Sequence, residues 1–262
     1  MMKQAVLYVC HGSRVPEACR EALAFIDKVK PLVNVSIQET GFLELAEPTI
    51  GDGFKACVDK GATHIAVVPL LLLTAAHAKK DIPEELAHVA SNYPDIKLTY
   101  GKPIGVDERI ADILLGKMNE KEALASDSIA ILVGRGSSDP DVKRDFTEIA
   151  RQLQEKSSLK QVKACFLTAA EPSFDDVIHD IHASNEQQIY LLPYLIFTGL
   201  LKKGIDKTVQ SYDWGNRSLY HCDYLGDHPL LLNIFMQRVQ ETVENKNNEY
   251  VFHVDEYASV AY

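Results

Sequence analysis

The sequence predicts an α/β fold made of two similar domains, each with a parallel β-sheet that carries helices on both faces. Two observations lead to this prediction. Short apolar runs that suit buried strands alternate with longer amphipathic segments that suit helices, along all 262 residues. The second half of the chain also repeats special residues of the first half at a constant spacing. A strand–helix–strand order favours crossover connections and therefore parallel pairing.

The first two strand–helix pairs are clear in the first half. The apolar run AVLYV at 5–9 precedes a glycine-containing turn and is typical of a buried parallel strand. Apolar residues then recur at helical spacing from Ala18 to Val29. A second strand is predicted at about 35–43. We expect Pro48 to open the next helix as a first-turn proline.

Two more pairs complete the half. THIAVVPLLLL at 63–73 predicts the third strand, and a helix follows that includes 82–93. The fourth strand is predicted at 97–101, before a helix at 106–118. Each half is therefore expected to form a flavodoxin-like domain.

A shift of 124 residues superposes the halves without a gap from Val9 to Thr74. The matched residues include glycines, prolines and a phenylalanine that are unlikely to coincide by chance. They are Gly12-Ser13 with Gly136-Ser137, Phe42-Leu43 with Phe166-Leu167, and Ala46-Glu47-Pro48 with Ala170-Glu171-Pro172. We therefore predict an N-terminal domain at 1–124 that carries the site, a C-terminal repeat at 125–245 and a tail at 246–262.

Three polar residues of the first half follow strand ends, where open parallel sheets bind ligands. His11 follows the first strand, Glu44 the second and His77 the third. At the corresponding positions the second half has Arg135, Thr168 and Leu201. A single histidine in such a turn is more often a structural hydrogen-bonding group. The joint loss of all three residues in the second copy favours a functional site that was kept once.

Two imidazoles and a carboxylate form a suitable site for Fe²⁺, Co²⁺, Ni²⁺ or Zn²⁺, and the carboxylate can also accept protons. Other candidates are weaker. His179 and His182 are three residues apart on a predicted helix, which suits an ion but suits a surface helix better. Cys10 adjoins His11, but successive strand residues face opposite ways, so a buried thiol is favoured over a nucleophile.

Composition excludes several classes of protein. A formal net charge of −10 argues against coating of nucleic acid, which needs a basic surface. The five cysteines include no C-x-x-C pair, which argues against a zinc ribbon, an iron–sulfur cluster and a disulfide framework. The segment GRGSSDP at 134–140 lacks the Walker A lysine and the dinucleotide fingerprint, so no ATP or NAD requirement is expected.

The apolar segments predict neither secretion nor membrane insertion. The N-terminal apolar stretch is too short for a signal peptide. The longest apolar run, from Ala66 to Ala76, is too short for a bilayer and contains Pro69. We expect a cytoplasmic protein.

The segments CHGSR at 10–14, GFLELAEPTI at 41–50 and PLLLLTAAHAKKDIP at 69–83 resemble the class II tetrapyrrole chelatases. The similarity is strongest to the long, internally duplicated sirohydrochlorin chelatases and extends to about residue 240. The resemblance implies insertion of ferrous or cobaltous ion into sirohydrochlorin, without ATP and with release of two protons. It also implies that His11 and His77 handle the metal and that Glu44 is their acidic partner.

Cobalt-specific long members of this family often carry a histidine-rich tail and a cysteine-ligated iron–sulfur cluster. Here the tail has one histidine, His253, and no cysteine, so the resemblance favours the iron enzyme of siroheme synthesis. Two alternatives stay open at this point: a cobaltochelatase of cobalamin synthesis, and a protein that binds or delivers a divalent metal without chelatase activity.

An acidic protein needs local positive charge or amide groups to bind a substrate with eight carboxylates. Ser13 and Arg14 lie in the first strand-end turn, and Arg135 occupies the matching turn of the second half. These residues are predicted to contact the substrate carboxylates. Because the duplication supplies within one chain what a single-copy relative gains by dimerising, we expect a monomer.

Overall fold

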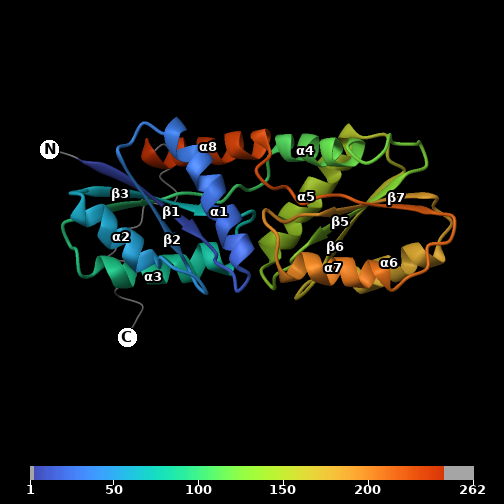
Figure 1. Cartoon of the computed structure of the whole chain (residues 1–262), viewed down its shortest axis with the longest axis horizontal. Coiled ribbons are helices and arrows are strands. Elements are labelled where there is room, and N and C mark those ends of the chain that lie inside the picture. The colour runs from blue at the N-terminus through green and yellow to red at the C-terminus, as the bar shows by residue number, and fades with distance from the viewer. Residues whose placement is uncertain (1–2, 245–262) are drawn as a thin grey trace. The chain divides into compact units, whose positions relative to one another are not determined.

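The structure, a computed structural model, describes residues 3–244 and contains two parallel sheets of four strands each (Figure 1). The strand orders are β2-β1-β3-β4 and β6-β5-β7-β8, which are the same order in the two halves. The predicted α/β fold of two similar flavodoxin-like domains is therefore confirmed. The predicted tail at 246–262, with His253, lies outside the described residues. Within residues 3–244, no helix is long and apolar enough to cross a membrane.

The first sheet has β1 at its centre, between β2 and β3. Its strands are β1 (Gln4–Cys10), β2 (Ile37–Phe42), β3 (His64–Leu70) and β4 (Lys97–Tyr100). The connecting helical segments are α1 (Pro16–Val29), η1 (Lys30–Leu32), α2 (Ile50–Asp59), the π-helical turn η2 (His77–Asp81) and α3 (Ile82–Ala90). Alternate residues of β1 point to opposite faces, so Leu7 packs with Phe54 and Leu86 of α2 and α3. Tyr8 faces the other side.

The second sheet repeats this arrangement. Its strands are β5 (Ile129–Gly134), β6 (Gln161–Phe166), β7 (Gln188–Pro193) and β8 (Ser218–His221). Its helices are α5 (Pro140–Lys156), α6 (Phe174–Ala183) and α7 (Leu200–Gln210). Ile131 of β5 shares a buried cluster with Ile178 of α6 and Ile205 of α7. Both sheets thus have helices on both faces, as predicted.

The repeat predicts that each half of the chain keeps its own last helix. In the structure, each of these two helices belongs mainly to the unit that holds the sheet of the other half. One compact unit comprises Val106–Leu231, and the other comprises the described residues up to Gly105 together with those from Leu232 to residue 244. Helix α4 (Glu108–Asn119) therefore packs with α5 in the second unit, and most of α8 (Pro229–Val243) packs in the first. The boundary expected between residues 124 and 125 does not coincide with these units.

Apolar burial explains the position of α8. Phe235 is fully buried, with its ring centroid 6.2 Å from that of Tyr8 and 5.7 Å from that of Phe25. The Arg238 guanidinium donates to the carbonyl oxygens of Pro103 and Ile104 beyond β4. A helix covers the sheet that its apolar face fits, and the sequence order does not decide which sheet that is.

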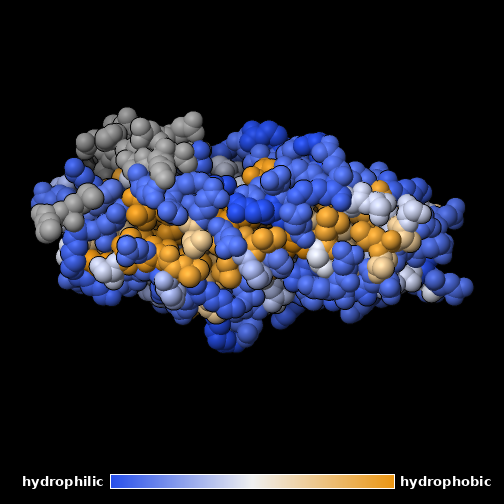
Figure 2. All heavy atoms as spheres, turned by 90° about the horizontal axis from the view of Figure 1, so that it is seen from above, coloured by the Kyte–Doolittle hydropathy of each residue, from blue (hydrophilic) through white to orange (hydrophobic). Residues whose placement is uncertain are grey.

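On the face shown in Figure 2, hydrophobic residues gather between hydrophilic ones. In the described part of the chain, the large apolar side chains that are mainly exposed are Leu32, Leu45 and Leu200, which are 61%, 50% and 65% exposed. Leu45 directly follows Glu44 after β2, and Leu200 begins α7 in the second half.

The turns after the first and second strands of each half touch through their backbones. The Glu44 N–H donates to the His11 carbonyl at 3.1 Å, and the Thr168 N–H donates to the Arg135 carbonyl at 2.9 Å. Gly12 has a φ of +93° and is so close to the Glu44 carbonyl oxygen that a Cβ would lie 1.7 Å from it. The fold itself therefore brings residues 11 and 44 together.

The helix after β2 begins later than predicted. Pro48 precedes the helix, which starts at Ile50 with Thr49 as its N-cap. The Thr49 hydroxyl oxygen accepts from the Asp52 N–H at 3.1 Å, and the Asp52 carboxylate accepts from the Thr49 N–H at 2.9 Å. This capping box satisfies two backbone N–H groups, which a proline in the first turn does not do.

The two glycine turns allow a matched test of this account. Gly12→Ala and Gly136→Ala should each lower the free energy of unfolding by about 1–3 kcal/mol, because both place a Cβ against a carbonyl oxygen in a left-handed turn. Urea unfolding monitored by circular dichroism measures this loss. Equal stability of either variant and the wild type would contradict the close approach.

Candidate functional site

Two histidines from different strand ends face each other in the first half. His11 follows β1 and His77 begins η2, seven residues after the end of β3. Their Nε2 atoms are 3.0 Å apart, and the rings meet edge to face with centroids 4.5 Å apart. Each side chain is 28% exposed. The two predicted imidazoles are therefore brought together at an accessible position.

The other nitrogen of each ring contacts an oxygen that can only accept. The His11 Nδ1 atom is 3.0 Å from the Gly12 carbonyl oxygen, and the His77 Nδ1 atom is 2.7 Å from a carboxylate oxygen of Asp81. Since a carbonyl or carboxylate accepts, both Nδ1 atoms carry the proton in these contacts. In neutral imidazoles this directs two Nε2 lone pairs toward each other, and a cation between them, a proton or a metal ion, relieves the repulsion.

The separation of the two nitrogens suits a metal ion. With Nε2–metal bonds of about 2.1 Å, donors 3.0 Å apart subtend an angle of about 90° at the ion, as in neighbouring positions of an octahedron. Among residues 3–244, no three His, Cys, Asp or Glu side chains are arranged to hold an ion as they stand. The arrangement is a pair of nitrogen donors with an acidic residue beside them.

Glu44 supplies that acidic residue. Its carboxylate oxygen is 3.6 Å from the His11 Nε2 atom, and its side chain is 48% exposed. This distance is longer than a strong hydrogen bond, so the carboxylate is near the nitrogen pair without being fixed to it. The next residue, Leu45, has a φ of +61° and an exposed side chain. The carboxylate thus lies beside one of the two imidazoles, and an exposed leucine follows it in the chain.

The predicted substrate-binding residues have different surroundings. The Ser13 hydroxyl oxygen accepts from the Val15 N–H at 3.0 Å, and Ser137 makes the same contact with the Asp139 N–H at 3.1 Å. Both halves therefore use this serine to shape the turn. Arg14 is exposed in the first unit. Arg135 is also exposed but belongs to the second unit, and its contact with a substrate stays a prediction.

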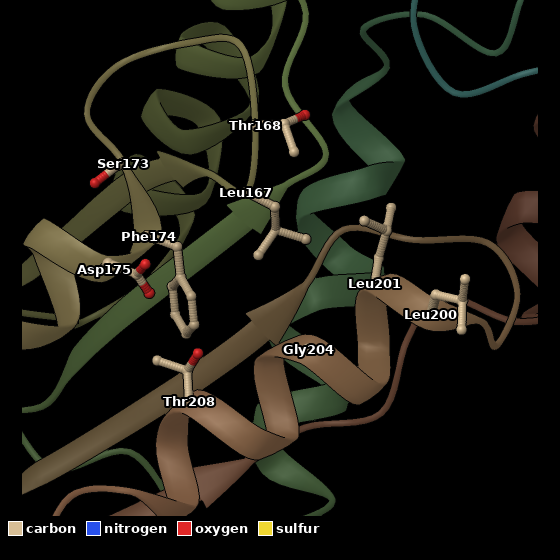
Figure 3. A pocket seen from close by; sticks show the side chains of 9 residues that line it. All are labelled: Leu167, Thr168, Ser173, Phe174, Asp175, Leu200, Leu201, Gly204 and Thr208. Carbon is tan, nitrogen blue, oxygen red and sulfur yellow. The ribbon is translucent and has the colours of Figure 1, made fainter.

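The second half has a pocket of about 250 Å³ at the corresponding strand ends (Figure 3). Apolar groups and hydroxyls line most of it. The lining residues are Leu167, Thr168, Ser173, Phe174, Asp175, Leu200, Leu201, Gly204 and Thr208. The lining thus includes one carboxylate and no imidazole, which agrees with the predicted loss of the metal-handling groups from this copy.

The weaker candidates from the sequence are His179, His182 and Cys10. His182 on α6 contacts the Asp213 carbonyl oxygen at 2.8 Å, and His179 is exposed on the same helix. Cys10 is buried, and burial raises the pKa of its thiol to about 12, so it is a poor nucleophile. Sequence reasoning did not find the pair of His221 and Asp206, whose Nδ1 and carboxylate oxygen are 3.0 Å apart in the second unit.

A family model described as CbiX matches residues 5–121 and again residues 130–242, once in each half. The chain belongs to the CbiX family. This result confirms the family that the sequence motifs predicted. The two matched ranges also agree with the internal repeat.

Similar proteins cover the whole chain. The chain is 49% identical over 261 residues to a Bacillus subtilis (strain 168) protein named sirohydrochlorin ferrochelatase, and the match covers 100% of both. It is 35% identical to a sirohydrochlorin cobaltochelatase of Priestia megaterium, over 93% of this chain and 81% of that protein. The solved structure of SirB from Bacillus subtilis with Fe³⁺ has a TM-score of 0.88 and 49% identity, and covers 96% of this chain and 100% of that one.

The facing nitrogens predict that the protein binds a divalent ion without any tetrapyrrole. Titration with Co²⁺, followed by its visible absorption bands, should show binding that weakens at least about 10-fold in His11→Ala and in His77→Ala. His179→Ala removes an exposed imidazole from the second half and is the matched control, with unchanged affinity expected. Equal Co²⁺ affinity in all four proteins would show that the pair is not a metal site.

Proposed function

We propose that this CbiX-family protein is a sirohydrochlorin ferrochelatase, which inserts Fe²⁺ into sirohydrochlorin and releases two protons. The observation that carries the proposal is the pair of histidine Nε2 atoms 3.0 Å apart, with a carboxylate 3.6 Å from one of them. The 49% identity to a named sirohydrochlorin ferrochelatase over the full length supports the same reaction. No step of it needs ATP, NAD or an iron–sulfur cluster.

The chemistry of metallation assigns a role to each of the three residues. Two pyrrole N–H groups must lose their protons while the four ring nitrogens take up a divalent ion. His11 and His77 hold the ion at one face of the macrocycle through their Nε2 lone pairs. Glu44 accepts protons from the pyrrole N–H groups and, because its side chain is half exposed, passes them to water.

The surroundings of Glu44 suit a flat, largely apolar ring. Leu45 exposes about half of its surface directly after Glu44, whereas the second half has alanine, Ala169, in the same left-handed conformation. An exposed leucine beside a polar site offers contact area to the face of a macrocycle. A protein that only carried a metal ion would gain nothing from it. This observation favours a chelatase over a metal-delivery protein.

The comparisons favour iron over cobalt as the physiological substrate. The ferrochelatase relative is 49% identical over the full length, and the cobaltochelatase relative is 35% identical. Fe²⁺ and Co²⁺ are neighbours in affinity for nitrogen and oxygen ligands, so both are expected to react in vitro. A location in the cytoplasm and a monomeric state complete the proposal.

An anaerobic assay tests the function directly. Mixing the protein with sirohydrochlorin and Fe²⁺ should change the tetrapyrrole absorption spectrum much faster than the protein-free control. His11→Ala and His77→Ala should abolish this acceleration and keep the circular dichroism of the wild type. Glu44→Gln keeps the shape but removes the base, so kcat should fall by about 10²–10⁴ with little change in KM for sirohydrochlorin. A wild-type rate equal to the uncatalysed rate would refute the proposal.

The arginines are tested through the salt dependence of substrate binding. Arg14→Ala and Arg135→Ala should each raise KM for sirohydrochlorin at low ionic strength, and the difference from wild type should shrink as salt is added. Arg144→Ala, which removes an exposed arginine that is paired with Asp141 and Asp145 on α5, is the control. An unchanged KM at low salt in both variants would indicate that backbone amides bind the carboxylates.

A further inference from the structure

His77 is held by a residue on its own helical turn. The Asp81 carboxylate oxygen is 2.7 Å from the His77 Nδ1 atom, and the Asp81 side chain is 41% exposed. The two residues begin and end the π-helical turn η2. Residues four apart in a helix are neighbours on its surface, so the turn itself places the carboxylate against the imidazole.

The turn arises from one extra residue in the first half. Lys79-Lys80-Asp81-Ile82 matches Lys202-Lys203-Gly204-Ile205 at a spacing of 123 residues, one fewer than the 124 that holds up to Thr74. Burial supports this shift, since Ile82 and Ile205 are both fully buried. An inserted residue that leaves the rest of a helix in register produces a π-helical turn, and such turns often occur at functional sites.

The shifted register changes which residues correspond. His77 now matches Leu200 in place of Leu201, and Asp81 matches Gly204. The second copy therefore lacks both the imidazole and the carboxylate behind it. Packing does not explain the missing carboxylate, because a Cβ added at Gly204 would meet no atom within 4 Å. The histidine and its acidic partner occur together in one copy and are absent together from the other.

A buried tyrosine fixes the same turn from the sheet. The Tyr100 hydroxyl donates to the Ala78 carbonyl oxygen at 2.9 Å, and Tyr100 is 5% exposed at the end of β4. In the strand register Tyr100 pairs with Val67, and His221 pairs with Leu191 at the equivalent place in the second half. The second half thus has no tyrosine hydroxyl at this position, where its helix α7 is regular.

We propose that Asp81 is the positioning residue of the site: it accepts a hydrogen bond from the His77 Nδ1–H, and so keeps the Nε2 lone pair directed at the ion and at His11. The expected effect on metallation kinetics rests on the proposed function. The expected effects on the His77 tautomer and on metal affinity rest on geometry alone. A carboxylate behind an imidazole ligand fixes its tautomer and ring orientation and increases its basicity. In this role Asp81 acts through His77.

Three variants separate this role from a general effect of charge or folding. Asp81→Ala removes the acceptor, Asp81→Asn keeps an oxygen that accepts from Nδ1–H but removes the charge, and Glu84→Ala removes an exposed carboxylate one turn further along the helix. Three experiments are carried out on each. The ¹⁵N shifts of the His77 ring report the tautomer, a titration gives the Co²⁺ affinity without tetrapyrrole, and steady-state kinetics give kcat and KM for metallation. Circular dichroism confirms that each variant is folded.

In the wild type and in Glu84→Ala, we expect His77 to carry its proton on Nδ1. Asp81→Ala should move part of the His77 population to the Nε2–H tautomer and weaken Co²⁺ binding about 10- to 100-fold. It should lower kcat and leave KM for sirohydrochlorin unchanged. Asp81→Asn should restore the tautomer and most of the Co²⁺ affinity.

An unchanged tautomer and unchanged Co²⁺ affinity in Asp81→Ala would overturn the proposal, as would equal losses in Asp81→Asn and Asp81→Ala. The ring shifts and the Co²⁺ affinity do not depend on chelatase activity. A wild type that fails to metallate sirohydrochlorin would therefore refute the proposed function alone.

Discussion

The site depends on one constraint of parallel sheets, which is that adjacent strands end at the same edge. Strand β1 lies between β2 and β3, so the segments that follow these three strands must share a small region. Hydrogen bonds extend the pairing past the strands: the Leu43 N–H donates to the Cys10 carbonyl at 2.9 Å and the Glu44 N–H to the His11 carbonyl at 3.1 Å. Gly12 allows this close approach. The chemistry of the site is built on the backbone of its central strand.

The same backbone frame occurs in the second half, where it carries other side chains. Gly136, the hydrogen bond from Thr168 to Arg135, and the left-handed residue Ala169 reproduce the turn geometry of Gly12, Glu44 and Leu45. The Ser13 turn is also repeated at Ser137. Features that both halves share are therefore required by the fold. Other features are found in one half only, and the chemistry of the site explains them. They are the two histidines, Glu44, Asp81 and the π-helical turn.

This comparison also shows what the sequence could and could not predict. Strand positions and the three strand-end residues followed from apolar runs and from the repeat, because both depend on local pattern. The sequence did not predict the exchange of α4 and α8 between the packing units. An amphipathic helix specifies an apolar face and not the sheet that this face covers. Asp81 was missed because the repeat was followed only to Thr74. The shift from KKDI to KKGI after that residue is the signal that would have revealed it.

A chelatase has to release its metal, and the geometry of the nitrogen pair suits that need. The four nitrogens of the tetrapyrrole compete with the protein for the ion, so a complete cage of protein ligands would hold the ion back and slow the transfer. Two Nε2 atoms 3.0 Å apart occupy two neighbouring positions around an ion and leave the others open to the substrate. Glu44, 3.6 Å from one nitrogen and half exposed, is near enough to receive protons without closing the site. Hydrogen bonds from the Nδ1 atoms to the Gly12 carbonyl and to Asp81 keep both lone pairs correctly directed before the ion arrives. The protein thus fixes the direction of two nitrogen donors and supplies few ligands in total. Because few ligands hold the ion, its delivery is favoured over its storage.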